Sequence, residues 1–220
     1  MPHALVLVGR GRYEDPWHDH AATSHALVAL LEDAGWTARL RSTFPDALDD
    51  DVPDLLVVNA GSGPVDPAFD GADDVWRPFH DRRAALTDGG VPVLAVHQAA
   101  NTFEDDPRWA ATLGGRWVEG TSWHPPLGDA AFRVVDHAHP VTADLADGLA
   151  AVDERYLDLQ VSGPVHVLAV ADHEGTPHPV VWATEGPARV VYSALGHDVR
   201  SYGSPSHRAL LRSAAGWLVG

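Results

Sequence analysis

Three short, mostly apolar runs, each followed by polar residues or glycine, constrain the fold of this chain more than any other feature. They are Ala4–Val8, Asp54–Asn59 and Val91–Val96. Strands of a parallel sheet are buried on both faces and therefore read as nearly continuous apolar runs. We expect the three runs to be parallel neighbours, with their carboxyl ends along one crevice.

Helical patterns separate these runs. Residues Thr23–Ala34 carry apolar side chains at helical spacing and are followed by Gly35, a residue that commonly ends helices. Trp36–Leu40 alternates like a strand, and Trp76–Leu86 is compatible with a second helix. Strands that alternate with helices predict right-handed parallel crossovers, and so a doubly wound α/β arrangement.

The second half of the chain has a different pattern. Beyond Gly114-Gly115, short strands follow one another with little helix between them, which predicts antiparallel pairing added to the sheet. An amphipathic helix over Ser206–Leu218 closes the pattern, and no repeat or linker divides it, so we expect one domain over residues 1–220. The four predicted strands of this half are Phe132–Val135, Val165–Ala171, Val180–Ala183 and Arg189–Ser193.

Composition excludes several functional classes. The formal net charge is −16, which disfavours nucleic acid and anionic membrane surfaces as partners. All 15 cationic side chains are arginines, and the chain contains no lysine and no cysteine. A Schiff-base lysine, a cysteine nucleophile and a cysteine-ligated zinc are therefore excluded. The reactive and metal-binding groups that remain are side-chain oxygens and histidine imidazoles.

The N-terminal apolar run is too short for a signal peptide or a membrane-spanning helix. We therefore expect a cytoplasmic protein. The sequence does not fix the oligomeric state, and a homo-oligomer stays open.

His97 and Gln98 follow the third apolar run directly. In open α/β sheets, ligands bind outside the carboxyl ends of the strands, so side chains at this position face a crevice. We predict a catalytic or metal-binding role for His97 and a substrate-binding role for Gln98. The alternative is that His97 only caps the following helix.

Two other histidine-rich segments are candidates for binding. His18 and His20 follow the first strand, at the same predicted edge as His97, and Trp123 precedes His124. Converging imidazoles suit a divalent metal such as Zn²⁺, and we consider His20, His97 and His124 as ligands. His18 and Trp123 are candidate sugar contacts. The alternative is a solvated loop in which His20 caps the first helix.

Carboxylates and another histidine occur further along the chain. Asp153 and Glu154 are candidate proton-transfer groups beside Tyr156, and His197 and Asp198 follow the last predicted strand. A histidine supported by a carboxylate is the usual general base, so His197 is a candidate catalytic residue. Tyr156 and Asp198 are candidate substrate contacts. Pairing of the carboxylates with Arg155 would instead be structural.

The order of these motifs resembles that of the ThuA-like family, which is associated with trehalose utilisation. The resemblance covers nearly the whole chain and is most specific at Asp-Glu-x-Tyr and Leu-Gly-His-Asp. The segments that carry it are the loop with His20, Val96-His97, Gly114-Gly115 with His124, His139-Pro140, Asp153-Glu154-Tyr156, Pro179–Trp182, Arg189–Tyr192 and Leu195–Asp198.

The resemblance implies a class I glutamine amidotransferase-like fold, which is a flavodoxin-like three-layer sandwich, and a role in the metabolism of glycosides or keto-sugars. In amidotransferases the turn after the corresponding strand carries a nucleophilic cysteine, whereas His97 occupies that position here. The chain is therefore not expected to be a glutamine amidotransferase.

Two functions remain open. One is an enzyme, a hydrolase, lyase or isomerase, that acts on a small-molecule carbohydrate by His and carboxylate acid–base chemistry, with or without a metal. The other is a non-catalytic sugar-binding or regulatory domain, because a fold shared with enzymes does not establish catalysis.

Overall fold

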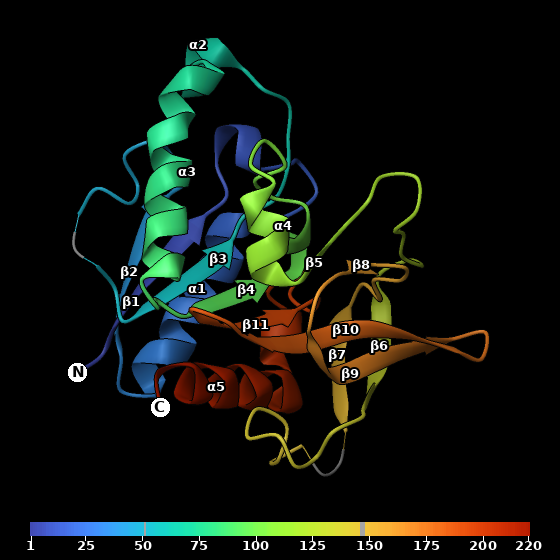
Figure 1. Cartoon of the computed structure of the whole chain (residues 1–220). Helices are drawn as coiled ribbons and strands as arrows, with labels where there is room; N and C mark the ends of the chain where they lie inside the picture. The colour runs from blue at the N-terminus through green and yellow to red at the C-terminus, as the bar shows by residue number, and fades with distance from the viewer. Residues whose placement is uncertain (51, 146–147) are drawn as a thin grey trace.

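The structure is a computed structural model that describes residues 1–50, 52–145 and 148–220. Its described strands form a mixed nine-stranded sheet, in the order β2-β1-β3-β4-β11-β10-β9-β6-β7, and a separate two-stranded pair. Helices cover both faces of the parallel half of the large sheet, which makes a three-layer α/β sandwich (Figure 1). This confirms the fold class predicted from the sequence.

The parallel half contains the three apolar runs in the predicted arrangement. β1 pairs in parallel with β3, and β3 pairs in parallel with β4. All five residues of β3 and all four of β4 are buried, as expected for strands covered on both faces. The parallel strands are β1 (His3–Val8), β2 (Thr37–Ser42), β3 (Leu55–Asn59), β4 (Val93–Val96) and β11 (Arg189–Ser193).

Four antiparallel strands extend the sheet beyond β11, which confirms the antiparallel pairing expected for the second half of the chain. One of them, β7, was not predicted, and the predicted strand Arg189–Ser193 is β11, which pairs in parallel with β4. Because β10, β9, β6 and β7 alternate in direction, β7 runs parallel to β4 and β11. The carboxyl end of β7 therefore lies at the same edge of the sheet as theirs. These strands are β6 (Gly128–Val134), β7 (Leu149–Asp153), β9 (His166–His173) and β10 (Thr176–Glu185).

The helices lie in two layers. α1 and α5 contact each other on one face of the sheet, and α3 and α4 contact each other on the opposite face (Figure 1). Asp19 caps α1 by accepting a hydrogen bond from the Ala22 amide, so His20 is not the capping residue. No helix of the described residues is long and apolar enough to span a membrane. The helices are α1 (His20–Asp33), α2 (Pro67–Asp70), α3 (Asp73–Asp88), α4 (Arg108–Leu113) and α5 (Pro205–Val219).

Besides β7, two features near the site were not predicted. A 3₁₀ helix, His97–Ala100, begins directly after β4, where His97 has a left-handed backbone with φ of 48°. The second element is the pair formed by β5 (Gly115–Arg116) and β8 (Gln160–Val161).

Candidate functional site: an imidazole and carboxylate cluster

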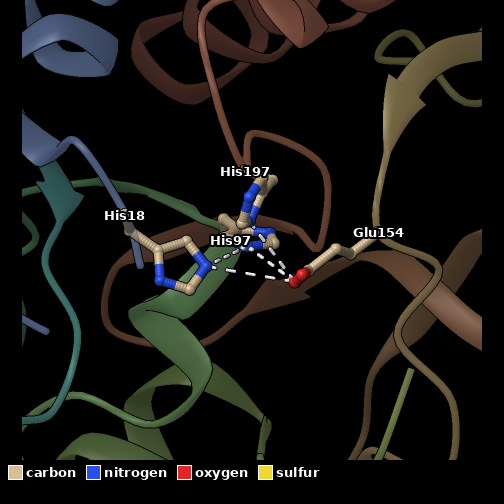
Figure 2. Close-up of side chains that lie close together, drawn as sticks. All are labelled: His18, His97, Glu154 and His197. Carbon is tan, nitrogen blue, oxygen red and sulfur yellow. Dashed lines mark hydrogen bonds and ion pairs between the residues drawn. The ribbon is translucent and has the colours of Figure 1, made fainter. Parts of the chain in front are cut away.

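Four loops at one edge of the sheet bring three histidines and one glutamate together. His18 lies in the loop after β1, His97 follows β4, His197 follows β11, and Glu154 follows β7. Figure 2 shows the three imidazoles and the carboxylate pointing toward one another. One possible ligand atom from each side chain lies within 4.8 Å of those of the other three. We call these four residues the imidazole cluster.

Glu154 is at the centre of the cluster. Its Oε2 atom lies 3.4 Å from His197 Nδ1, 3.6 Å from His97 Nε2 and 3.9 Å from His18 Nε2. Burial opposes ionisation of Glu154, but the three imidazoles outweigh it and hold the pKa of this carboxyl well below its usual range. Glu154 is therefore a carboxylate at neutral pH.

His97 and His18 face each other through their Nε2 atoms, which are 3.1 Å apart. His97 Nδ1 donates to the carbonyl oxygen of Ala194 at 2.7 Å, which leaves the Nε2 lone pair directed into the cluster. His18 Nδ1 donates to Asp15 at 2.8 Å. Each of these two imidazoles therefore has one nitrogen anchored outside the cluster and the other directed into it.

The carboxylates also determine the charge of His18. Burial lowers the pKa of this imidazole, but Asp15 and Glu154 outweigh burial and raise the pKa of His18 to about 9. Burial likewise opposes ionisation of Asp15, and the hydrogen bond from His18 overcomes this and lowers the pKa of Asp15 to about 2. In the metal-free protein at neutral pH, His18 is thus an imidazolium held between two carboxylates.

The cluster opens into a cavity of about 550 Å³. A more open depression of about 840 Å³ lies beside β7 and the start of α5, but its lining of described residues contains no histidine. The chemistry therefore points to the smaller cavity. That cavity is lined by Trp17, His18, Gln98, Asn101, Trp117, Glu119, His124, Glu154, Tyr156 and His197.

Two further lining residues contact the cluster. The Tyr156 hydroxyl lies 3.0 Å from His97 Nε2, and burial raises the pKa of Tyr156 well above its ordinary value, so the phenol keeps its proton. His124 approaches from the more open side, where its Nδ1 atom is 3.5 Å from Glu154 Oε1.

The structure brings seven of the sequence-predicted site residues to the cavity or the cluster: His18, His97, Gln98, His124, Glu154, Tyr156 and His197. It places His20 behind His18, with the ring centroids 6.0 Å apart. His20 is buried, and this burial, together with the nearby His18, lowers its pKa to about 4. Neither His20 nor His124 belongs to the imidazole cluster. The predicted ligand set of His20, His97 and His124 is therefore wrong in two of its three members.

Three other predicted residues lie outside the cavity lining. Asp153 turns away into the protein and accepts hydrogen bonds from the amides of Gly196 and His197. Asp198 pairs with Arg200. Trp123 is half-exposed and donates through its indole nitrogen to Asp158.

Several lining or supporting residues were missed in the sequence. Trp117, rather than Trp123, lines the cavity, as do Asn101 and Glu119. Asp15, which orients His18, was also missed. Its signal is the Asp-x-x-His spacing, because in a tight loop residues three apart can face each other.

The fold and the site together define an α/β protein of amidotransferase-like architecture, with an imidazole and carboxylate cluster in the loops after β1, β4, β7 and β11. A family model described as "ThuA: Trehalose utilisation" matches residues 7–218, and the chain belongs to this family. No curated protein sequence matches the chain.

Solved structures agree with this fold. A ThuA-like protein from Parabacteroides merdae aligns with a TM-score of 0.80 at 18% identity, covering 99% of this chain and 90% of that chain. A ThuA-like protein from Bacteroides uniformis gives a TM-score of 0.73 at 16% identity, covering 99% and 91%. A GMP synthase component from Thermoplasma acidophilum gives 0.61 at 14% identity, covering 98% and 94%. At these identities the similarity establishes the fold alone.

Proposed function

We propose that this chain is a carbohydrate enzyme that transfers a proton on a glycoside or keto-sugar, with a divalent metal such as Zn²⁺ held by the imidazole cluster. The observation that carries the proposal is the convergence of His18, His97, His197 and Glu154 at the wall of one cavity. Membership of a family described by trehalose utilisation supports a carbohydrate as the substrate.

The chemistry of the four residues fits a metal. Imidazole nitrogens with a carboxylate oxygen are a common ligand set for Zn²⁺. Glu154 Oε2 and His197 Nδ1 are buried, face each other at 3.4 Å and have no hydrogen-bond partner in the described structure, so a ligand bound between them would satisfy both. His18 and His97 each donate their outer N–H to an oxygen, which is the usual arrangement of metal-binding histidines.

A bound metal would act as a Lewis acid and polarise a sugar carbonyl or hydroxyl oxygen. A carbonyl makes the neighbouring C–H acidic, so one base in the cavity is enough to remove that proton. Isomerisation returns the proton at a neighbouring atom, and elimination expels an oxygen leaving group from the adjacent carbon.

We propose His124 as this base. It lines the cavity outside the group of four, and its Nδ1 lies 3.1 Å from the Pro125 carbonyl oxygen, which favours a proton on Nδ1 and a free lone pair on Nε2. Tyr156 keeps its proton, and once a metal takes the Nε2 lone pair of His97, the hydroxyl can donate to a sugar oxygen instead of to His97. Gln98 and Asn101 also line the cavity, and their side-chain amides are the kind of group that binds sugar hydroxyls.

This proposal redistributes the roles predicted from the sequence. His97, His197 and Glu154 change from proton-transfer groups to ligands, and His18 changes from a sugar contact to a ligand. His124 changes from a ligand to the base. His20 has no ligand role, because it lies behind His18.

The test is turnover of sugars by metal-loaded protein. Purified protein is stripped with a chelator, reloaded with Zn²⁺, Mn²⁺ or Co²⁺, and incubated with trehalose and with glycosides oxidised to ketones at one ring hydroxyl. Products are identified by NMR. We expect a keto-glycoside to be consumed by one metal-loaded form and not by the stripped protein.

Variants separate the roles. His197→Ala should lose both metal and activity, whereas His124→Ala should keep the metal and lose at least about 100-fold in kcat, the low end of a general base's contribution. His25→Ala, at an exposed position of α1, is the matched control. Saturable sugar binding without turnover under every metal would identify a non-catalytic sugar-binding domain. If the protein neither binds nor turns over any of these sugars, the proposal is overturned.

A further inference from the structure

The carboxylate of Asp153 accepts four hydrogen bonds in the interior, beside the imidazole cluster. Its donors are the amides of Gly196 at 2.7 Å, His197 at 3.2 Å and Glu154 at 2.9 Å, together with the Ser201 hydroxyl. Asp153 is 1% exposed and forms no ion pair among the described residues. A carboxylate this deeply buried is tolerated only when hydrogen bonds satisfy it.

The donors come from two loops that otherwise lie at separate places in the sequence. Gly196, His197 and Ser201 belong to the segment after β11, whereas Asp153 ends β7 and directly precedes Glu154. The one carboxylate therefore fixes the distance between the backbone that carries Glu154 and the backbone that carries His197.

The same segment also orients His97. The carbonyl oxygen that accepts from His97 Nδ1 belongs to Ala194, two residues before Gly196. Gly196 has a φ of 130°, and a Cβ there would lie 2.7 Å from the Tyr202 hydroxyl and 3.5 Å from His97 Cβ, so the segment passes close to both side chains. A displacement of this segment would move the Ala194 carbonyl and His197 together.

We infer that Asp153 is a positioning residue that holds the segment 194–197 against the end of β7 and thereby fixes three of the four cluster residues, His97, His197 and Glu154. The inference deepens the proposed function and rests on it, because it assigns the part of the fold that shapes the proposed metal site. It differs from a proton-transfer role, since Asp153 is buried outside the cavity lining and cannot touch a substrate there.

Asp153 is in turn supported from α5. The Ser201 hydroxyl donates to Asp153, and Ser201 Oγ lies 2.9 Å from Nδ1 of the fully buried His207. Since its hydroxyl proton goes to Asp153, Ser201 can accept from His207 Nδ1–H. This chain of contacts joins α5 to the cluster through Ser201 and Asp153.

The experiment compares Asp153→Asn with the wild type in two measurements that need no metal. Asparagine keeps the size of the side chain but has only one acceptor oxygen for the four donors. We expect hydrogen exchange of the Gly196 and His197 amides to accelerate at least tenfold relative to amides of β4. We also expect the imidazole ¹⁵N signals of His97 to shift, because the Ala194 carbonyl no longer fixes its tautomer.

A third measurement joins the inference to the proposed function. Zn²⁺ affinity should fall at least tenfold in Asp153→Asn, as expected when the support of a metal ligand is lost. The matched control is Asp70→Asn, which removes a buried carboxylate of α2 whose partners, the amide of Arg12 at 2.7 Å and its guanidinium at 3.2 Å, are not cluster residues. That control should leave all three readouts near the wild-type values.

Each outcome decides a separate point. Unchanged exchange and imidazole signals in a folded Asp153→Asn variant would overturn the inference, and so would effects no larger than those of Asp70→Asn. If Asp153→Asn does not fold, Ser201→Ala removes a single donor and should produce the same changes at smaller size. If the wild type binds no Zn²⁺, the metal proposal fails, while the exchange and imidazole measurements still decide the role of Asp153.

Discussion

Replacing Asp15 by asparagine should weaken metal binding without changing any ligand. Asp15 Oδ1 accepts from His18 Nδ1 at 2.8 Å and from the amides of Trp17 at 2.8 Å and His18 at 3.1 Å. Asparagine can keep these three bonds through its own Oδ1 atom, so the loop should stay in place. The variant loses the negative charge that makes the His18 imidazole a better ligand, together with the second contact of His18 Nδ1, which lies 3.0 Å from Asp15 Oδ2.

Above the His18 pKa of about 9, where the metal displaces no proton from His18, loss of such an outer partner typically lowers metal affinity by about 10- to 100-fold. At about 1.4 kcal/mol per tenfold change, this corresponds to about 1.4 to 2.8 kcal/mol of binding free energy. Isothermal titration of chelator-stripped protein with Zn²⁺ measures the difference directly. Asp19→Asn, which removes the same charge from the same loop but leaves His18 untouched, is the matched control.

Asp19→Asn should change the affinity by less than about threefold, because an exposed charge is strongly screened. An equal loss of affinity in both variants would show that only general electrostatic attraction is involved. No loss in Asp15→Asn would refute the reasoning that the bond between Asp15 and His18 prepares a ligand.

Two other predictions concern stability. Gly114 has a φ of 78°, and a Cβ there would lie 2.6 Å from Val165 Cγ1. Gly114→Ala should therefore lower the free energy of unfolding, measured in urea, by about 2 to 5 kcal/mol, because left-handed strain and overpacking add to each other. Gly163→Ala, at a φ of 77° with open space around the Cβ, should cost only the strain of about 1 to 2 kcal/mol, and equal losses would contradict the packing argument. Burial lowers the pKa of His207, so this imidazole resists protonation in the folded state. The contribution of His207 to the free energy of unfolding is fully present above its unfolded pKa of about 6.5, and it is lost as the pH falls below that value. Between pH 7 and 5, the unfolding free energy should therefore fall less in His207→Gln than in the wild type. The two slopes should differ by up to about 1.4 kcal/mol per pH unit below about pH 6.5. Identical slopes would show that His207 does not contribute to the pH dependence of stability.

The parallel half of the fold was predictable because its signals are local. Continuous apolar runs such as Leu55–Asn59 identify buried strands, and the polar residues that follow them identify the edge where ligands bind. His97 and His18 could therefore be placed at one crevice from sequence alone.

The antiparallel half concealed the rest of the site. β7 has the sequence Leu-Ala-Ala-Val-Asp, in which buried and exposed positions alternate but alanines blur the hydrophobic contrast. Without β7, nothing in the sequence shows that Glu154 returns to the same edge as His97. The role of Asp153 was hidden for the same reason, since its partners after β11 lie more than forty residues away.

Orientation within the loops also lay beyond local patterns. His18 and His20 are two residues apart, yet His18 faces the cavity, whereas His20 begins α1 and is buried behind it. Which of Trp117 and Trp123 lines the cavity depends on the path of the loop around them, and spacing alone does not determine that path.

The most direct test of the central claim is anomalous diffraction from crystals of the protein soaked with Zn²⁺ and measured at the zinc absorption edge. We predict a peak bound by His18, His97, His197 and Glu154, with ligand distances of about 2.0 to 2.2 Å. A peak held by His20 and His124 instead, or no peak at the imidazole cluster at saturating Zn²⁺, would contradict the proposed metal site.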